Sequence, residues 1–531
     1  MSPARMILNA LGRAVPEEVN GRPQRPFAGL GGYRPTGRKV GPPIASCADF
    51  GKDKRVPSLR AALERCGLKN GATIGIHHHF RNGDLTVLPL FRTLEEMGLR
   101  DLVFAPSALF PCHEPLIPFL ERGVIDHIEG SMNGPIGRFC SYGRMRGTGV
   151  LRSHGGRFQA VQDGDLHIDL GIIPAPSADA FGNANGVHGP SACGPLGFAL
   201  ADSLYADKVI VLTDHLVPFP CVPWEIQGQN VDHVVVVDRV GDPSKIVSGT
   251  TQITRSPTRL LIAEYVARFI EEASLLGSSF QAGAGGISLA FIQFLARRMR
   301  EKGVHAPFAR GGSTQHLVKM LEEGLIGAIL DGQSFDLCGV ASLRDNPRHV
   351  ATSPFTSYNY HGKGNFAAQV GVAVLGATEV DLKFQANVVT HSDGVLLHGI
   401  GGWQNTLDAD CSILAFPLFR GRIPIVVDEV MTCCAPGESI DVVITERGIA
   451  INPRREDLRE KLRGSSLPIC SIEELYQAAL RICGKPARPE RDLEKPVAII
   501  KWVDGTVIDS VFQVPPVVND LPREPSEGGG G

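Results

Sequence analysis

The feature that most constrains the fold is a short segment that occurs twice, about 200 residues apart. Residues 119–125 read Phe-Leu-Glu-Arg-Gly-Val-Ile, and residues 320–326 read Met-Leu-Glu-Glu-Gly-Leu-Ile. Each copy is followed within a few residues by an acid–glycine pair, at residues 129–130 and 331–332. A match of this kind, in two places with similar surroundings, indicates an internal duplication.

Strand and helix patterns alternate in the same order around both copies, which favours largely parallel sheets flanked by helices. Pro89 conflicts with one of the predicted helices, so we expect a kink or a later start there. A capping box of Ser471 and Glu474 predicts a further helix. In the first half we expect strands over residues 71–79, 102–105 and 124–128 and helices over 84–97 and 114–122; in the second half, a helix that begins at Ser256-Pro257, strands over 279–282 and 325–330, a helix between them and another over 317–323.

The duplication predicts two α/β domains, with a boundary near residue 256. We expect the first domain over residues 51–256 and the second over residues 257–515. Residues 1–50 are rich in proline and glycine and predict an extended arm that becomes ordered only against a partner. Residues 516–531 end in four glycines and predict a flexible tail.

Composition excludes several classes of protein. The formal charge is −3 and the pI is about 6.6, so no basic surface for nucleic acid is expected. The longest apolar run, Gly285–Ala296, has about 12 residues, whereas a membrane helix needs roughly 18. Met1–Leu11 is too short for a signal peptide. The 12 cysteines form no CxxC pair, which indicates reduced thiols and a cytoplasmic location.

Glycine is over-represented, with 61 of 531 residues, against roughly 7% in an average protein. Collagen is excluded because there is no three-residue period, and global disorder is excluded because 43% of residues are hydrophobic. Two compact glycine loops stand out, Gly283–Gly286 and Gly399–Gly402. Backbone N–H groups in such loops can bind phosphate, carboxylate or an oxyanion. Neither loop matches a known nucleotide motif, and a tight packing turn explains them about equally well.

Three consecutive histidines, His77, His78 and His79, end the first predicted strand. Successive side chains of a strand face opposite ways, so the three cannot converge on one ion, and we expect no metal site. One or two of them, together with Arg81, are expected to line the mouth at the carboxyl end of the strand, where open α/β sheets bind ligands. Core or surface histidines are an equally good alternative.

Two further polar groups follow predicted strands. Arg310 follows a short strand predicted over residues 305–309 and precedes two glycines. A guanidinium beside open backbone suits a polycarboxylate, although a solvated arginine at a helix start fits about equally well. Gln333 and Ser334 lie in a polar turn predicted over residues 331–336. No Gly-x-Ser-x-Gly elbow or cysteine–histidine pair indicates a hydrolase.

Several segments together resemble the CoA-transferase superfamily and, within it, the family of citrate lyase alpha chains. Residues 165–169 and 178–186 are similar to the first half of a CoA-transferase, and residues 379–381 and 399–402 to the second half. The similarity extends from about residue 50 to residue 515. The narrower family is indicated by residues 77–87 (HHHFRNGDLTV), 153–157 (SHGGR), 237–242 (VDRVGD), 333–336 (QSFD) and 420–424 (RGRIP).

The resemblance implies two tandem CoA-transferase-like α/β domains with mostly parallel sheets flanked by helices. It implies a reaction in which citrate and an acetyl thioester give a citryl thioester and acetate. The thioester is carried by acyl-CoA or by the CoA-like prosthetic group of an acyl-carrier gamma chain, and a beta chain then cleaves the citryl thioester. The resemblance therefore implies a cytoplasmic hetero-oligomer, with no cofactor bound covalently to this chain.

One departure from the superfamily bears on mechanism. CoA-transferases that form a covalent enzyme thioester use a glutamate in a Ser-Glu-Asn-Gly segment, and the corresponding residues here are Ala309-Arg310-Gly311-Gly312. The missing glutamate predicts direct transfer through a mixed anhydride. We assign backbone amides at Gly285 and Gly401 to the oxyanion, Arg310, Arg81 and His78 to the carboxylates, Asn387 to orienting a reacting group, and Gln333, Ser334, Gly283, Gly286 and Gly402 to the substrate site.

Three alternatives remain open at this point. The chain could act on another acid, such as citramalate or a short-chain acyl-CoA. It could instead be a non-catalytic scaffold of a lyase complex, whose glycine loops only bind the carrier. A sugar-phosphate isomerase of the same sheet type needs a general base near the loops, and the duplication and the arm argue against it.

Overall fold

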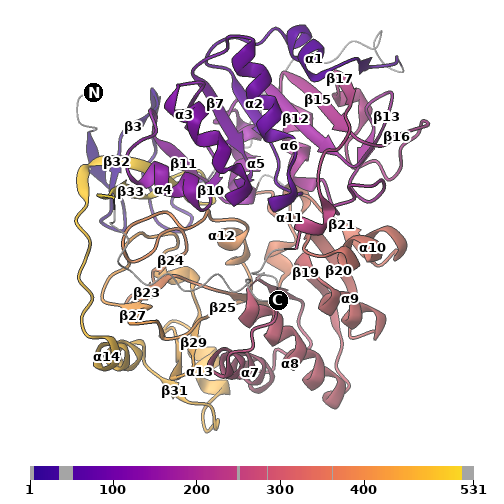
Figure 1. Cartoon of the computed structure of the whole chain (residues 1–531). Helices are drawn as coiled ribbons and strands as arrows, with labels where there is room; N and C mark the ends of the chain where they lie inside the picture. Colours follow the sequence, from indigo (N-terminus) through magenta and orange to yellow (C-terminus); the bar gives the residue numbers. More distant parts are fainter. Residues whose placement is uncertain (1–4, 35–51, 248–251, 284, 361–362, 517–531) are drawn as a thin grey trace.

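The computed structural model of the chain describes residues 5–34, 52–247, 252–283, 285–360 and 363–516. Within these residues the chain forms two large sheets, each flanked by helices (Figure 1). The tail predicted from residue 516 onward lies outside the described residues from residue 517. No helix of the described part is both long enough and apolar enough to cross a membrane.

The first large sheet has seven strands and the second has nine. In spatial order the first contains β5 (Arg55–Val56), β17 (His233–Val236), β15 (Lys208–Thr213), β12 (Leu170–Ala175), β6 (Thr73–Ile76), β7 (Leu102–Pro106) and β9 (Ile125–Ile128). The second contains β21 (His349–Ala351), β20 (Ile326–Ser334), β19 (Ala306–Ser313), β18 (Phe280–Ala282), β22 (Val372–Leu375), β25 (Cys411–Ala415), β29 (Val442–Thr445), β30 (Gly448–Ile451) and β31 (Ile469–Cys470).

Helices cover both sheets, and most of them connect one parallel strand to the next (Figure 1). The first unit contains α1 (Leu59–Cys66), α2 (Val87–Glu96), α3 (Ile117–Glu121), α4 (Pro135–Ser141), α5 (His154–Asp163) and α6 (Leu200–Tyr205). The second contains α7 (Pro257–Glu272), α8 (Gly286–Lys302), α9 (Gln315–Glu322), α10 (Leu337–Asp345), α11 (Pro354–Ser357), α12 (Trp403–Thr406), α13 (Glu456–Lys461) and α14 (Ile472–Cys483).

The two sheets repeat one topology. The order β17-β15-β12-β6-β7-β9 in the first sheet matches β29-β25-β22-β18-β19-β20 in the second, and all these neighbours pair in parallel. The repeated sequence segment corresponds to α3–β9 and α9–β20. Each unit also has a small sheet, formed by β13 (Ser177–Asp179), β14 (Ala184–Asn185) and β16 (Leu216–Val217), or by β23 (Glu379–Asp381), β24 (Ala386–Asn387) and β28 (Val426–Val427). The predicted pair of α/β units is therefore present.

Local sequence signals set several helix ends. Helix α2 begins at Val87, so Pro89 lies in its first turn, where the missing proline N–H leaves no hydrogen bond unmade. The conflict noted in the sequence is thus resolved by a later start. Helix α14 has the predicted capping box, in which the Ser471 side chain accepts from Glu474 N and the Glu474 side chain accepts from Ser471 N.

Three strand ends differ from the prediction. Strand β6 ends at Ile76, so the three histidines lie in the loop after the strand. Strands β19 and β20 continue through Ser313 and Ser334, so residues 331–334 of the predicted polar turn are extended strand. The two strands stay paired up to Ser313–Ser334, past an irregularity between Gly311 and Gly312. Pairing with a neighbour, which local composition does not encode, keeps them extended.

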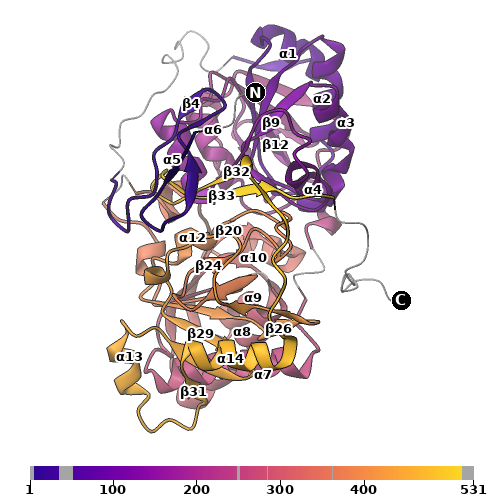
Figure 2. The same ribbon diagram turned by 90° about the vertical axis from the view of Figure 1, so that its left-hand side faces the viewer.

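Both ends of the described chain lie together against the first unit. Strand β11 (Gly149–Leu151) pairs with β32 (Asp492–Lys501), which forms a hairpin with β33 (Val507–Gln513). Residues 5–34 form two short strand pairs, β1 (Met6–Leu8) with β2 (Ala14–Pro16) and β3 (Glu18–Val19) with β4 (Arg22–Pro23). Figure 2 shows these N-terminal strands beside the yellow C-terminal hairpin.

This packing ties the start of the chain to its end. The Asn9 side chain donates to Ile508 O at 2.7 Å, and Ser510 Oγ donates to Ala14 O at 3.0 Å. The described part of the predicted arm is therefore packed on its own chain. Residues 35–50 of the arm lie outside the described residues. The boundary near residue 256 separates the two large sheets, but the C-terminal hairpin lies with the first unit, and the domain limits stay a prediction.

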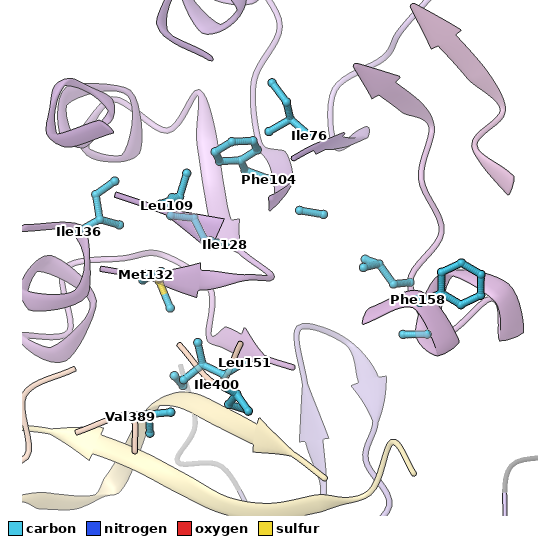
Figure 3. Close-up of a cluster of buried hydrophobic side chains, with 14 of the residues drawn as sticks. Ile76, Phe104, Leu109, Ile128, Met132, Ile136, Leu151, Phe158, Val389 and Ile400 are labelled. Atoms are coloured by element: carbon cyan, nitrogen blue, oxygen red, sulfur yellow. The ribbon is translucent and has the colours of Figure 1, made fainter. Parts of the chain in front are cut away.

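One buried apolar cluster joins the two units. It contains Ile76, Phe104 and Ile128 from the first sheet, and Val389 and Ile400 from the second unit. Figure 3 shows part of this cluster, including these five side chains. The shared core holds the facing loops of the two units in a defined arrangement, because buried side chains are close-packed.

Candidate active site

Several of the residues predicted for the site, among them His78, Gln333 and Gly401, meet where the two units face each other. The N-terminus of α5 donates from His154 N to Gly401 O at 2.8 Å and from Gly155 N to the Asn405 side chain at 3.0 Å. Gln333 Nε2 donates to His78 O at 3.3 Å. These bonds connect the histidine loop and α5 of the first unit with β20 and the second glycine loop.

Arg310 is the most deeply buried of the predicted charged residues. It is 2% exposed. Its Nη1 donates to Gln281 Oε1 at 2.5 Å and to the Tyr358 hydroxyl at 3.2 Å, and the guanidinium lies 4.6 Å from the centre of the Tyr358 ring. Its Nε has no hydrogen-bond partner among the described residues. All these partners are neutral, so the guanidinium has no carboxylate within ion-pair distance in the described part of the chain.

His78 lies in an aromatic enclosure at the same boundary. Its ring stacks on His154 at 5.1 Å and on Phe198 at 4.7 Å between centroids, with Phe110 at 6.0 Å. Burial, and then the nearby His154, lower the pKa of His78 well below its ordinary value. Burial also lowers the pKa of His154 to about 3. Both imidazoles are therefore neutral near pH 7.

The three histidines have separate partners. His77 Nε2 lies 3.0 Å from Asp202 Oδ2, and His78 Nδ1 lies 2.6 Å from Ser107 Oγ. His79 is fully buried, and neither ring nitrogen has a hydrogen-bond partner among the described side chains and backbone groups. The histidines therefore do not converge on one point, although the reason is a loop rather than the predicted strand.

Arg81 ends the same loop beneath two aromatic rings. Its guanidinium lies 5.2 Å from the Phe110 ring centre and 5.0 Å from that of Phe335, which follows β20. Burial lowers the pKa of Arg81 to about 10, so the side chain remains cationic at neutral pH. Arg81 and Arg310 thus place positive charge on both sides of the boundary.

The glycines of the first glycine loop have different surroundings. An ideal Cβ built on Gly285 meets no atom within 4 Å, so packing does not explain the glycine. A Cβ on Gly286 meets Gln252 O at 3.0 Å and Thr254 N at 3.1 Å, which indicates close packing. Gly283 has only an ordinary contact with Ser288, at 3.4 Å. Of the three, Gly285 best fits a surface that a ligand approaches.

The second glycine loop lies directly against the enclosure. Gly401 has φ +62°, a conformation that glycine adopts at little cost. A Cβ on Gly402 would lie 2.7 Å from the Tyr358 hydroxyl, which is the oxygen that Arg310 contacts. Gly402 therefore permits Tyr358 to approach the loop, and substitution there would disturb the partner of Arg310.

Two predicted residues have mainly structural contacts. Ser334 Oγ donates to Asp331 Oδ2 at 2.8 Å, in a buried network with Ser313. Asn387 donates to Glu379 and Thr390 and accepts from Val389 N and Thr390 N, so it organises the turn after β24. No contact joins Asn387 to Arg310 or His78 among the described residues. Its role in orienting a reacting group stays a prediction.

Four contributing residues were not assigned to the site from the sequence: His154, Tyr358, Gln281 and Ser107. His154 lies in the SHGGR segment that carried the family resemblance, which was the available signal. Tyr358, Gln281 and Ser107 have no distinguishing pattern, because their roles come from neighbours that are distant in sequence.

A family model described as citrate lyase, alpha subunit, matches residues 52–514. The chain belongs to the citrate lyase alpha subunit family. The resemblance inferred from the sequence is thereby confirmed, and the chain is an enzyme subunit of the CoA-transferase type.

Individual relatives agree with this assignment. The chain is 41% identical to the citrate lyase alpha chain of Haemophilus influenzae over 478 residues, which cover 89% of this chain and 95% of that protein. It is 42% identical to that of Klebsiella pneumoniae over 493 residues, with coverage of 92% and 96%.

Solved structures support the fold. A Streptococcus mutans protein described as the alpha subunit of citrate lyase, in complex with citrate, superposes with a TM-score of 0.91 at 41% identity, over 95% of this chain and 99% of that chain. A malonate decarboxylase alpha subunit from Acinetobacter baumannii has a TM-score of 0.58 at 17% identity, with coverage of 82% and 89%. A 4-hydroxybutyrate CoA-transferase from Porphyromonas gingivalis has a TM-score of 0.51 at 16% identity, with coverage of 80% and 96%. The last two share the fold alone.

Proposed function

We propose that this chain is the citrate CoA-transferase subunit of a citrate lyase. It exchanges the acyl group of a thioester, so that citrate and an acetyl thioester give a citryl thioester and acetate. The thioester is that of acyl-CoA or of the CoA-like prosthetic group of an acyl-carrier gamma chain. A beta chain consumes the citryl thioester, and the three chains form a hetero-oligomer in the cytoplasm. Membership of the family supports this assignment.

The observation that carries the proposal is the charge of Arg310. A buried guanidinium with only neutral partners is costly, and an anionic ligand relieves that cost. Arg81 adds a second buried cation across the boundary. The guanidinium groups of Arg310 and Arg81, together with the neutral imidazole of His78, therefore suit a substrate with several carboxylates. The structure of the related Streptococcus mutans protein with citrate is consistent with such a ligand.

The transfer occurs in two steps. A carboxylate oxygen of citrate attacks the acetyl carbonyl, the C–S bond breaks, and the thiolate leaves, which forms a citryl–acetyl anhydride. The thiolate then attacks the citryl carbonyl and acetate leaves with the bridging oxygen. Backbone amides at Gly285 and Gly401 stabilise the oxyanion in each step, and the loss of one such donor costs about 2.7–4 kcal/mol. Holding the two acyl groups together supplies much of the remaining acceleration.

No protein carboxylate is needed as an acyl carrier. By the correspondence inferred from the sequence, Arg310 replaces the acylated glutamate of related transferases, and its guanidinium contacts Gln281 and Tyr358. A cation at that place binds a carboxylate and cannot itself form a thioester. This supports direct transfer between two bound acyl groups.

The purified chain tests the activity directly. Acyl exchange between acetyl-CoA and citrate, followed by chromatography of the CoA esters, is expected without the beta chain. Citramalate and butyrate are the comparison acids. If kcat/KM is higher with either of them than with citrate, that acid is the better candidate for the substrate. A chain that exchanges no acyl group, alone or with its carrier, would support the scaffold alternative.

Arg310→Gln tests the carboxylate site. A charge-assisted hydrogen bond contributes about 1.5–3 kcal/mol, so KM for citrate should rise roughly 10- to 150-fold. Arg298→Gln is the matched control, because Arg298 pairs with Glu264 and Glu271 on the helical layer. An unchanged citrate KM in Arg310→Gln, with the control also unchanged, would remove Arg310 from the site.

Trapping tests the absence of a covalent intermediate. The chain is incubated with acetyl-CoA and then treated with hydroxylamine or borohydride. Intact-mass and peptide analysis should find no modified glutamate. A glutamyl hydroxamate or a reduced glutamyl side chain in active protein would contradict direct transfer.

A further inference from the structure

Ser107 makes two contacts with His78 that together determine the state of the imidazole. Ser107 follows β7, the neighbour of the strand that precedes the histidine loop. His78 N donates to Ser107 Oγ at 3.1 Å, and His78 Nδ1 lies 2.6 Å from the same oxygen. Ser107 is 6% exposed and so is His78, so neither group exchanges freely with solvent.

The position of the shared proton follows from the donors available. A serine hydroxyl has one proton to donate and can accept two bonds. Ser107 Oγ already accepts a hydrogen bond from the His78 backbone N–H. Among the described residues, Nδ1 of His78 is the one acceptor within reach of the Ser107 hydroxyl proton. The hydroxyl therefore donates to Nδ1. In a neutral imidazole the proton then resides on Nε2.

The neutral state is maintained by the surroundings of His78. Aromatic rings of Phe198 and Phe110 enclose it, and the cation of Arg81 and the histidines His77, His79 and His154 are the titratable groups that oppose a positive charge on it. No carboxylate is among the groups that shift the pKa of His78. The ring thus remains uncharged while it presents one N–H.

We propose that Ser107 is a positioning residue that fixes His78 as the Nε2–H tautomer, and that this N–H donates to the acyl oxygen of the substrate. The assignment of the acyl oxygen rests on the proposed function; the tautomer does not. A neutral imidazole N–H can polarise a carbonyl and stabilise the oxyanion that forms from it. From the sequence, His78 is assigned to the carboxylates of the substrate. In this proposal His78 instead donates a hydrogen bond to the acyl oxygen of the substrate.

His77 shows that neighbouring residues of the loop have different tasks. Its Nε2 lies 3.0 Å from Asp202 Oδ2, and an ionised carboxylate only accepts, so its N–H is used inside the first unit. No bond joins His78 Nε2 to another described residue. His78 is therefore the histidine of this pair that retains a donor for a ligand.

Nitrogen NMR tests the tautomer without reference to activity. The full chain is labelled with ring-¹⁵N histidine, and the His78 signals are assigned by their loss in His78→Phe. Long-range ¹H–¹⁵N correlations should show an unprotonated Nδ1 and a protonated Nε2, and this pattern should give way to a mixture in Ser107→Ala. A protonated Nδ1 in the wild-type chain, or an unchanged pattern in Ser107→Ala, would overturn the inference.

Kinetics test the role of the donor. His78→Phe keeps an aromatic ring and removes the N–H, so kcat should fall about 10²- to 10³-fold. Ser107→Ala should lose part of that factor with a smaller change in KM, and Ser107→Thr, which keeps the hydroxyl, should restore it. Ser412→Ala is the control, because Ser412 is a buried serine on β25 whose hydroxyl donates to Ser439 O. Equal loss in Ser107→Thr and Ser107→Ala, with both variants folded, would indicate packing alone.

The two sets of measurements separate the proposals. If no acyl exchange is found with citrate, the proposed function fails, and the nitrogen shifts still decide the tautomer. If exchange is found but the tautomer is the opposite one, the proposed function stands and the inference about Ser107 fails.

Discussion

Substitution of Asp202 by asparagine should destabilise the chain strongly. Asp202 lies on α6 and is fully buried. Arg157 bonds it twice, Nη1 to Oδ1 at 2.7 Å and Nη2 to Oδ2 at 2.9 Å, and also donates to Ala105 O at 2.8 Å. His77 contacts Oδ2. Burial alone would raise the pKa of Asp202, but Arg157 and then His77 outweigh it and hold that pKa well below its ordinary value.

The size of the destabilisation follows from the Arg157 guanidinium, which stays buried after the substitution. Asparagine keeps the shape of the side chain, but it leaves Arg157 buried without a counter-charge. Removing one partner of a buried ion pair costs about 3–5 kcal/mol. A unit of 150–250 residues shifts its melting temperature by about 2–4 °C per kcal/mol, so Tm should fall by roughly 6–20 °C.

Calorimetry on the purified chain measures this shift. Asp53→Asn is the matched control, because Asp53 forms an exposed pair with Arg55 and such pairs contribute about 1 kcal/mol or less. Adding Arg157→Met to Asp202→Asn removes the stranded charge and should recover part of the lost stability. Equal Tm values for Asp202→Asn and Asp53→Asn, or no recovery in the double variant, would refute the reasoning.

Three other outcomes are expected. Burial lowers the pKa of His79 to about 3, so His79 stays neutral in the folded chain, whereas the unfolded chain protonates it below about pH 6.5. As the pH falls from 6 to 4, His79 should therefore reduce stability by about 1.4 kcal/mol per pH unit, in addition to the contributions of the other buried histidines, and His79→Gln should lessen the slope in urea unfolding by that amount. Gly402→Ala should lower acyl exchange, because its Cβ would lie 2.7 Å from the Tyr358 hydroxyl, whereas Gly285→Ala meets no atom and should leave Tm unchanged. Ser471→Ala removes the cap of α14 and should cost about 1 kcal/mol in thermal unfolding.

Features with local causes could be predicted from the sequence. The cap at Ser471, the proline-limited start of α2 and the repeated α–β segment depend on residues a few positions apart. Strand ends could not be predicted in the same way. Strand β20 continues to Ser334 because β19 pairs with it, and no residue near Ser334 encodes that partner.

The candidate site shows the same division. Arg310, Gln333 and His78 could be proposed as candidates because each lies near the carboxyl end of a predicted strand, where open α/β sheets bind ligands. Tyr358 could not, because it acts through a contact made by the fold, the bond that its hydroxyl accepts from Arg310, 48 positions away. Likewise, the structural contacts of Asn387 depend on Glu379 and Thr390, which the spacing alone does not bring together.

The junction of the chain ends also sets the order in which the protein can mature. Asn9 bonds Ile508 O, 499 positions later, and at roughly 5–20 residues per second a ribosome needs about 25–100 s to cover that distance. During this time the edge of β11 that pairs with β32 is open, because β32 and β33 have not yet been synthesised. The N-terminal half therefore becomes complete last, and truncations near the C-terminus should expose this edge to aggregation in the half of the molecule that was synthesised first.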